Sequence, residues 1–264
     1  MRLEFAAIAS GSSGNCIYVA SNHTRLLIDA GLSGKRVEAG LGELSLTGYD
    51  IDALLITHEH NDHILGAGIM ARRYDLPVYA TDGTWNGIGD KMGRLRPSAK
   101  NVVYSGEPVI INDLCITPFS IPHDAAEPVG YTISDGVSKI SIATDIGHIT
   151  EDVKENVKDS DLLLIESNHD VDMVKDGPYP YMLKQRVLSD VGHLSNENCG
   201  KMLTEVLSDK MKYIFLGHLS EQNNTPMLAF ETAKKALENQ GVEIGGDINM
   251  YVAPRYGVKR RIML

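Results

Sequence analysis

Apolar runs separated by turn residues predict short β-strands along the first half of the chain. The runs at residues 16–20 and 24–28 flank the turn Ser21-Asn22-His23, a pattern typical of a β-hairpin. The strands expected in this half are 2–9, 16–20, 24–28, 53–57, 78–80, 102–104, 109–111, 114–121, 130–134 and 139–143.

Helical periodicity alternates with buried strands through the second half, and two helices are expected earlier in the chain. The first of these would begin after Ser33, a suitable N-cap. The expected helices are 33–44, 63–74, 150–157, 181–189, 196–207 and 226–240, and the later strands are 162–165, 213–216 and 250–253. This mixture favours an α/β (α+β) fold with two facing sheets and helices outside, in one domain spanning residues 1–264.

The chain is acidic, with a formal net charge of −10 over 264 residues, and 43% of its residues are hydrophobic. A protein held to nucleic acid mainly by its overall field would be basic, so any such contact must be made by a local site. The three cysteines form no CxxC motif and are expected to be reduced. Because no signal peptide or membrane-spanning run is seen, the expected location is cytoplasmic, with no membrane partner.

Three histidines and two acids are crowded into residues 58–63, which read HEHNDH and directly follow a buried apolar run. Alternate side chains of an extended segment point the same way, so His58 and His60 can face one point. Asp62 and His63 come where the chain turns into a helix, and they can present an oxygen and a nitrogen to a second point. Imidazole and carboxylate without thiolate suit zinc, manganese or iron. One short stretch can therefore supply ligands to two metal ions.

The motif HxHxDH at residues 58–63 resembles the hallmark of the metallo-β-lactamase superfamily. Four further residues match that family's motifs in order along the chain, namely Asp29, His123, Asp145 and His218. The resemblance implies that one metal takes His58, His60 and His123, that a second takes Asp62, His63 and His218, and that Asp145 bridges the two. It also implies that Asp29 is a buried group which orients the histidine loop. A structural role in a turn, cap or loop is the alternative for each of the four.

The same resemblance implies a four-layer αββα metallo-β-lactamase sandwich and a hydrolase that uses two divalent ions, Zn or Mn, with Fe as a further candidate. Two metals about 3.5–4 Å apart can hold a bridging hydroxide as the nucleophile. The superfamily hydrolyses lactams, thioesters, lactones and phosphodiesters, so the fold alone does not decide the substrate.

Further motifs are similar to those of the bacterial WalJ or YycJ family. They are SGSSGN at residues 10–15, ESNHD at 166–170, HLSN at 193–196, and HLS at 218–220 followed by NN at 223–224. This resemblance implies a 5′-to-3′ DNA exonuclease that is linked to mismatch repair and acts on the 5′ ends of DNA.

Four residues form the expected catalytic set: Asp62, His193, His169 and Glu166. His193 would protonate the departing 3′ oxygen, and His169 would do the same or contact a phosphate. Glu166 would orient one of these histidines. For each histidine, packing or helix entry remains an alternative.

The SGSSGN segment offers backbone N–H groups and hydroxyls that can form an anion nest, so Ser12, Ser13 and Asn15 are candidate phosphate contacts. The alternative is a plain tight turn between two strands.

The interval from Asp145 to His218 is 218 − 145 = 73 residues, too short for the large cap domain of cleavage-factor nucleases. Residues 167–196 can form only a small cap-like insertion, and a homodimer would enlarge the binding groove. Two other functions stay open. A small-molecule hydrolase of cyclic phosphodiesters, thioesters or lactones would have an enclosed apolar pocket. A non-catalytic regulatory module would have broken ligand motifs, whereas all seven positions are filled here.

Overall fold

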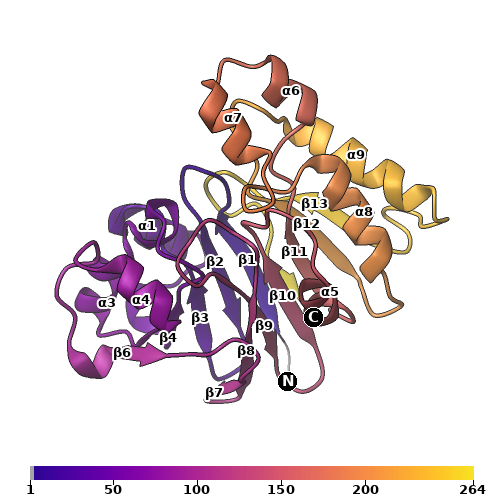
Figure 1. Cartoon of the computed structure of the whole chain (residues 1–264). Helices are drawn as coiled ribbons and strands as arrows, with labels where there is room; N and C mark the ends of the chain where they lie inside the picture. Colours follow the sequence, from indigo (N-terminus) through magenta and orange to yellow (C-terminus); the bar gives the residue numbers. More distant parts are fainter. Residues whose placement is uncertain (1–2) are drawn as a thin grey trace.

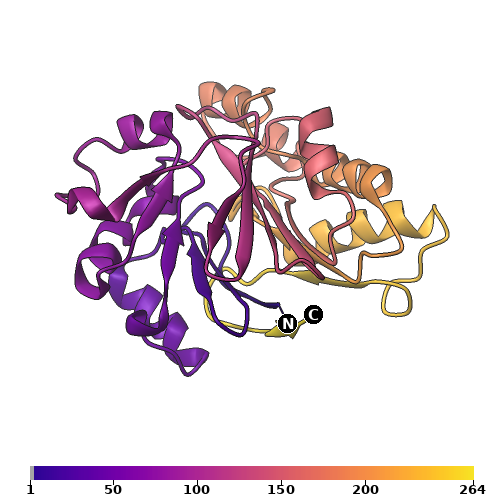
Figure 2. The same cartoon turned by 90° about the horizontal axis from the view of Figure 1, so that it is seen from below.

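Two seven-stranded β-sheets face each other, and helices cover the outer side of each sheet (Figures 1 and 2). The structure is a computed structural model that describes residues 3–264. In spatial order the first sheet contains β14 (Ile262–Met263), β1 (Glu4–Ala9), β2 (Cys16–Ala20), β3 (Arg25–Ile28), β4 (Ala53–Leu55), β5 (Val78–Ala80) and β6 (Lys100–Val102). The second contains β13 (Asn249–Val252), β12 (Tyr213–Gly217), β11 (Leu162–Glu166), β10 (Lys139–Ala143), β9 (Val129–Ser134), β8 (Leu114–Ser120) and β7 (Val109–Ile111).

The helices divide between the two sheets, except for a pair that extends beyond the strand ends. They are α1 (Gly34–Glu43), α2 (Asn61–Ile64), α3 (Ala67–Tyr74), α4 (Asp82–Ile88), α5 (Glu151–Val157), α6 (Val171–Asp176), α7 (Tyr181–Val187), α8 (Asn196–Val206) and α9 (Pro226–Glu238), with 3₁₀ turns η1 (Gly48–Asp50) and η2 (Pro97–Ala99). Figure 1 shows α1, α3 and α4 beside the first sheet, α5, α8 and α9 beside the second, and α6 and α7 beyond the ends of β11 and β12.

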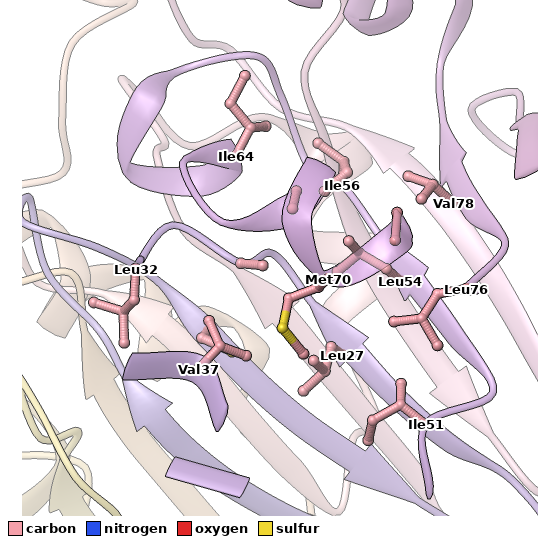
Figure 3. Close-up of a cluster of buried hydrophobic side chains, with 14 of the residues drawn as sticks. Leu27, Leu32, Val37, Ile51, Leu54, Ile56, Ile64, Met70, Leu76 and Val78 are labelled. Carbon is pink, nitrogen blue, oxygen red and sulfur yellow. The ribbon is translucent and has the colours of Figure 1, made fainter. Parts of the chain in front are cut away.

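Strand alternation divides the core into three layers of apolar side chains. Leu27 and Leu54 point to the helices of the first sheet and pack there with Met70 (Figure 3). Their neighbours Leu26 and Leu55 face the second sheet, because successive strand residues point to opposite faces. A third cluster fills the space between the second sheet and α5, α8 and α9. The expected four-layer αββα arrangement is therefore confirmed.

The continuous helix expected over residues 63–74 is wrong, because α2 and α3 are separate. The break falls at Leu65 and Gly66. The Gly66 N–H donates to the carbonyl of Ala30, and a Cβ on Gly66 would lie 2.3 Å from the carbonyl oxygen of Leu32. This close contact with the loop after β3 overrides the helical periodicity.

Smaller differences concern short elements and element ends. The strand expected at 102–104 lies at Lys100–Val102, where it pairs in parallel with β5. Ser33 precedes α1, but its side chain makes no capping hydrogen bond. The sequence pattern does not predict the helices α4 and α6 or the strand β14. The first strand was expected to begin at Arg2, which lies outside the described residues.

No helix within residues 3–264 is long and apolar enough to cross a membrane.

Candidate metal centre

The candidate ligands converge because they follow strands whose carboxyl ends meet at one edge of the sandwich. The strands β3 and β4 are parallel, and β10, β11 and β12 are parallel in the other sheet. Asp29 follows β3, and His58 and His60 lie three and five residues beyond β4. Asp145 and His218 follow β10 and β12 in the second sheet. Both sheets therefore deliver polar side chains to the same place.

Three of these residues leave their strands in the left-handed backbone conformation. The φ angles are 60° at Asp29, 61° at Asp145 and 54° at His218. Asp and His tolerate this region better than most non-glycine residues, but each such residue still costs about 1 kcal/mol or more. The sharp turns bring the three side chains back over the strand ends.

One group of nitrogens comes from His58, His60 and His123, each of which offers one ring nitrogen within 4.8 Å of the other two. Nε2 of His58 is 3.1 Å from Nδ1 of His60, which is 3.3 Å from Nε2 of His123. Lone pairs of three imidazoles crowded in this way suit a shared cation.

A second group comes from Asp62, His63 and His218. Oδ2 of Asp62 lies 3.6 Å from Nε2 of His63 and 3.5 Å from Nε2 of His218. Two nitrogens and one carboxylate oxygen thus face a second point.

Asp145 lies between the two groups. Its Oδ2 is 3.3 Å from Nε2 of His63, and its Oδ1 is 3.4 Å from Nε2 of His218 and 3.8 Å from Nε2 of His123. Asp145 is buried, and its Oδ2 has no hydrogen-bond partner among residues 3–264. A buried carboxylate oxygen needs a partner, and a divalent cation fits this position. Nitrogen and oxygen donors without sulfur match the ligand preferences of zinc, iron and manganese.

Hydrogen-bond partners outside the centre orient three of the rings, those of His63, His218 and His123, so that Nε2 faces the centre. Nδ1 of His63 lies 2.7 Å from Oδ2 of Asp29, and Nδ1 of His218 lies 2.7 Å from Oε1 of Glu166. Nδ1 of His123 lies 3.0 Å from the carbonyl of Gly192. Carboxylates and carbonyls accept the Nδ1 proton, which fixes the tautomer that binds metal through Nε2.

The charges of the site divide its histidines into two kinds. Burial, followed by the neighbouring imidazoles, holds the pKa of His58 well below its usual range. Burial would also lower the pKa of His63, but Asp145, Asp29 and Asp62 raise it to about 9. The pKa of His218 is raised against burial, first by Asp145. Without a cation, the carboxylates therefore favour the protonated forms of His63 and His218. A metal ion bound at these rings would supply positive charge in the same place.

Glu166 connects His193 to this centre. The Oε1 atom that accepts from His218 also lies 2.9 Å from Nδ1 of His193, while Oε2 accepts from the backbone N–H groups of Ile146 and Leu194. Glu166 is fully buried, and burial opposes its ionisation. The charge of His193, the bonds from His193 and His218, and the charge of His218 nevertheless hold its pKa well below the usual range. His193 keeps 17% of its side chain exposed.

The structure places His169 differently from His193. His169 is 1% exposed, bridges to Ser195 through the backbone, and has Nδ1 3.3 Å from Oδ1 of Asn168. Burial lowers its pKa to about 4. It belongs to none of the groups of convergent ligand atoms.

The SGSSGN loop lies against the same edge, but its members differ in how available they are. Oδ1 of Asn15 accepts from Gly11 N–H, and its Nδ2 lies 3.1 Å from Nε2 of His63. Ser13 accepts a hydrogen bond from Tyr256. Ser12 is exposed and lines a hollow that His193 also lines.

Two sets of contacts at the site are not predicted from the sequence, one made by Thr57 and the other by Arg186. Thr57 has its hydroxyl 2.9 Å from Asp29, 3.0 Å from Nδ1 of His58 and 3.2 Å from Nδ1 of His63. Arg186, in α7, pairs with Asp124, which directly follows His123. The position of Thr57 next to the candidate ligand His58 is a local signal that could have identified it. Arg186 and Asp124 are 62 residues apart, so the sequence carries no local signal for their contact.

The comparisons with known proteins agree with this geometry. Residues 24–214 match the family model described as the Beta-lactamase superfamily domain. The chain is 41% identical over 245 residues to exodeoxyribonuclease YycJ of Bacillus anthracis, covering 93% of both chains. It is 38% identical over 250 residues to exodeoxyribonuclease WalJ of Streptococcus pneumoniae, covering 94% of this chain and 93% of the relative.

Similarity to a solved structure supports the fold, and only the fold. The metallo-beta-lactamase fold protein YhfI from Bacillus subtilis superposes with a TM-score of 0.73 at 16% identity, covering all of both chains. The chain belongs to the β-lactamase superfamily and, within it, to the family of the YycJ and WalJ proteins.

Proposed function

We propose that this protein is a metal-dependent exodeoxyribonuclease that removes nucleotides from the 5′ end of DNA. The observation that carries the proposal is the pair of histidine–aspartate groups joined by Asp145. The relatives named exodeoxyribonucleases cover nearly the whole chain, so the same chemistry is inferred for this one.

His58, His60 and His123 would hold one divalent ion, and Asp62, His63 and His218 a second, with Asp145 shared. When bound, two such ions supply an activated water nucleophile and neutralise negative charge on a phosphodiester. Zn²⁺ and Mn²⁺ both suit the donor set, and Fe is a further candidate. Asp29, Thr57 and Glu166 hold the rings in place for this task.

His193 is the proposed general acid. Its Nδ1–H donates to Glu166, which leaves Nε2 to deliver a proton to the leaving 3′ oxygen. We propose His193 for this role in preference to His169, because His193 is partly exposed whereas His169 is buried with a lowered pKa. Asp62, 26% exposed at its side chain, would act in the reaction as a ligand of the second ion.

We further propose that residues 1–264 act as a single domain in the cytoplasm, with residues 167–196 as a small cap over the centre. The helices α6 and α7 belong to this cap. Ser12 and Ser13 would contact phosphates through the loop after β1. DNA is the proposed partner, and a homodimer would extend the groove.

The test is to remove metal from the protein with a chelator, reload it with Mn²⁺ or Zn²⁺, and supply duplex DNA beside a thioester and a small phosphodiester. Metal-dependent release of mononucleotides supports the proposal. Hydrolysis of the thioester or the small diester without DNA degradation would assign the centre to a small-molecule hydrolase instead.

A further inference from the structure

A hollow of about 150 Å³ lies beside the candidate centre, at the base of α7. His193 lines it together with Ser12, Asn168, Tyr179, Arg186 and Ser220. Apolar side chains of α7 complete the lining. This space is on the scale of a sugar and a phosphate and is too small for duplex DNA.

Arg186 is the one arginine or lysine side chain that lines this hollow in the described part of the chain. Its Nη2 lies 3.1 Å from Oδ1 of Asp124, and the charges of Asp62 and Asp145 also act on its pKa, which is raised first by the bond to Asp124. The guanidinium is therefore held in the field of the site's carboxylates. Half of its side chain is exposed, so its remaining N–H donors can reach a ligand. A guanidinium matches a phosphate through two parallel hydrogen bonds.

The direction of the proposed reaction decides what enters the hollow. In 5′-to-3′ removal of a nucleotide, the leaving group is the 3′ oxygen of the terminal nucleotide. If His193 protonates that oxygen, the sugar that carries it must lie on the His193 side of the centre. The hollow lined by His193 is on that side.

We propose that this hollow holds the sugar and the 5′-phosphate of the nucleotide being removed, and that Arg186 binds that 5′-phosphate. The inference rests on the proposed exodeoxyribonuclease function and adds a reason for end selectivity. A hollow of this size with a guanidinium in its lining suits a terminal nucleotide that carries a free 5′-phosphate.

The step balances with water as the co-reactant. The oxygen of water bonds to the scissile phosphorus, the bond from phosphorus to the 3′ oxygen breaks, and this oxygen takes a proton from His193. Water gives one proton to solvent, from which His193 regains its own. The products are a deoxynucleoside 5′-monophosphate and a DNA strand with a new 5′-phosphate, which is the next substrate.

The first arm of the test measures binding without cleavage. Titration calorimetry with 2′-deoxycytidine 5′-monophosphate and with deoxycytidine uses the metal-loaded wild type, Arg186→Gln and Arg96→Gln. Arg96 is a matched control, because it is also an exposed arginine paired with an aspartate, Asp75. The expected result is tighter binding of the monophosphate than of the nucleoside, with this preference lost only in Arg186→Gln.

The second arm compares kcat/KM on duplexes with 5′-phosphate and 5′-hydroxyl ends. Wild type and Arg96→Gln should prefer the 5′-phosphate at least about tenfold, as a bidentate arginine–phosphate contact implies, and Arg186→Gln should cleave both ends at similar rates. Equal cleavage of both ends by wild type, or a preference that survives in Arg186→Gln, would overturn the role of the hollow alone. Absence of cleavage on either end by metal-loaded wild type would overturn the proposed function itself.

Discussion

Oε1 of Glu166 lies 2.7 Å from Nδ1 of His218, and the same oxygen lies 2.9 Å from Nδ1 of His193. One buried carboxylate thus orients a candidate metal ligand and the candidate general acid. The two histidines are 25 residues apart in the sequence. Glu166 therefore connects the candidate metal centre to the candidate general acid through contacts that only the fold brings together.

Replacing Glu166 by Gln should damage both roles. All four groups that bond to this carboxylate are donors, and an amide NH₂ turned toward either pair would leave donors facing each other. We expect activity and metal affinity to fall by about 10–100-fold, as for other groups that support metal ligands. Stability should drop by about 1–3 kcal/mol, because a buried hydrogen bond is lost.

Glu59→Gln is the matched control for this substitution. Glu59 is also a buried carboxylate near the centre, but its Oε1 accepts only from the backbone of Ala126 and its Oε2 has no partner among the described residues. The amide can keep the first bond, so activity should stay close to that of wild type. Equal losses in the two variants, measured by calorimetric metal titration and a nuclease assay, would contradict the special role of Glu166.

Metal uptake should release protons. The pKa of His63 is raised to about 9, and that of His218 is raised well above its usual range, so in metal-free protein both rings bind a second proton more tightly than a free imidazole does. Since a ligating imidazole must lose the proton on the nitrogen that binds metal, filling the group of Asp62, His63 and His218 should release roughly two protons. Titration with Zn²⁺ in buffers of low and high ionisation enthalpy should give different heats, and affinity should rise from pH 6.5 toward pH 9. Identical heats in the two buffers would contradict this prediction.

Acid should destabilise the metal-free protein through His169. Burial lowers its pKa to about 4, below the value of about 6.5 in an unfolded chain, so the unfolded state binds more protons between these values. The neutral buried ring therefore contributes stability above pH 6.5 that is lost as the pH falls toward 4. From pH 7.5 to pH 5.0 this amounts to about 2 kcal/mol.

His169→Gln should remove that contribution, since glutamine does not titrate. Urea unfolding of the two metal-free proteins at pH 7.5 and pH 5.0 measures it. Wild type should lose about 2 kcal/mol more than the variant over this interval. The same loss in both proteins would show that His169 is not held neutral by the fold.

Gly31 and Gly42 should respond in opposite ways to substitution by Ala. A Cβ on Gly31 would lie 1.6 Å from the carbonyl oxygen of Asp62, so Gly31→Ala must displace the loop that carries Asp62 and His63. Gly42 is an exposed residue of α1 with nothing within 4 Å of its added Cβ, so Gly42→Ala should stabilise the protein by about 0.5–1 kcal/mol. Thermal unfolding and metal content check both. Normal metal binding by Gly31→Ala would be inconsistent with the packing described here.

The sequence predicts the parts of the fold that depend on local patterns. Continuous apolar runs such as 53–57 and 162–165 are recognisable as buried strands, and polar residues at their ends are recognisable as candidates for a shared site. This is why the two-sheet architecture and the metal-binding role of residues 58–63 can be expected from residue order, whereas the grouping of all seven candidate ligands follows from the resemblance to the metallo-β-lactamase superfamily.

The rest depends on contacts between distant segments or on very short elements. The break at Gly66 arises from packing against Ala30 and Leu32. The helices α4 and α6 have seven and six residues and begin at the side-chain caps Thr81 and Asp170, which give little periodic signal. The two-residue strand β14 exists because it pairs with β1 at the other end of the chain. The pairing of Arg186 with Asp124 likewise requires the fold.

The most direct test of the account is a time course on a duplex labelled at the 5′ end of one strand and, in a parallel sample, at its 3′ end. Metal-loaded wild type is compared with Asp145→Asn, which removes the carboxylate shared by the two ligand groups. We predict that wild type releases the 5′ label at once as a mononucleotide and the 3′ label only late, and that Asp145→Asn releases neither. Early release of the 3′ label, or undiminished release by Asp145→Asn, would contradict a 5′-to-3′ exonuclease built on this centre.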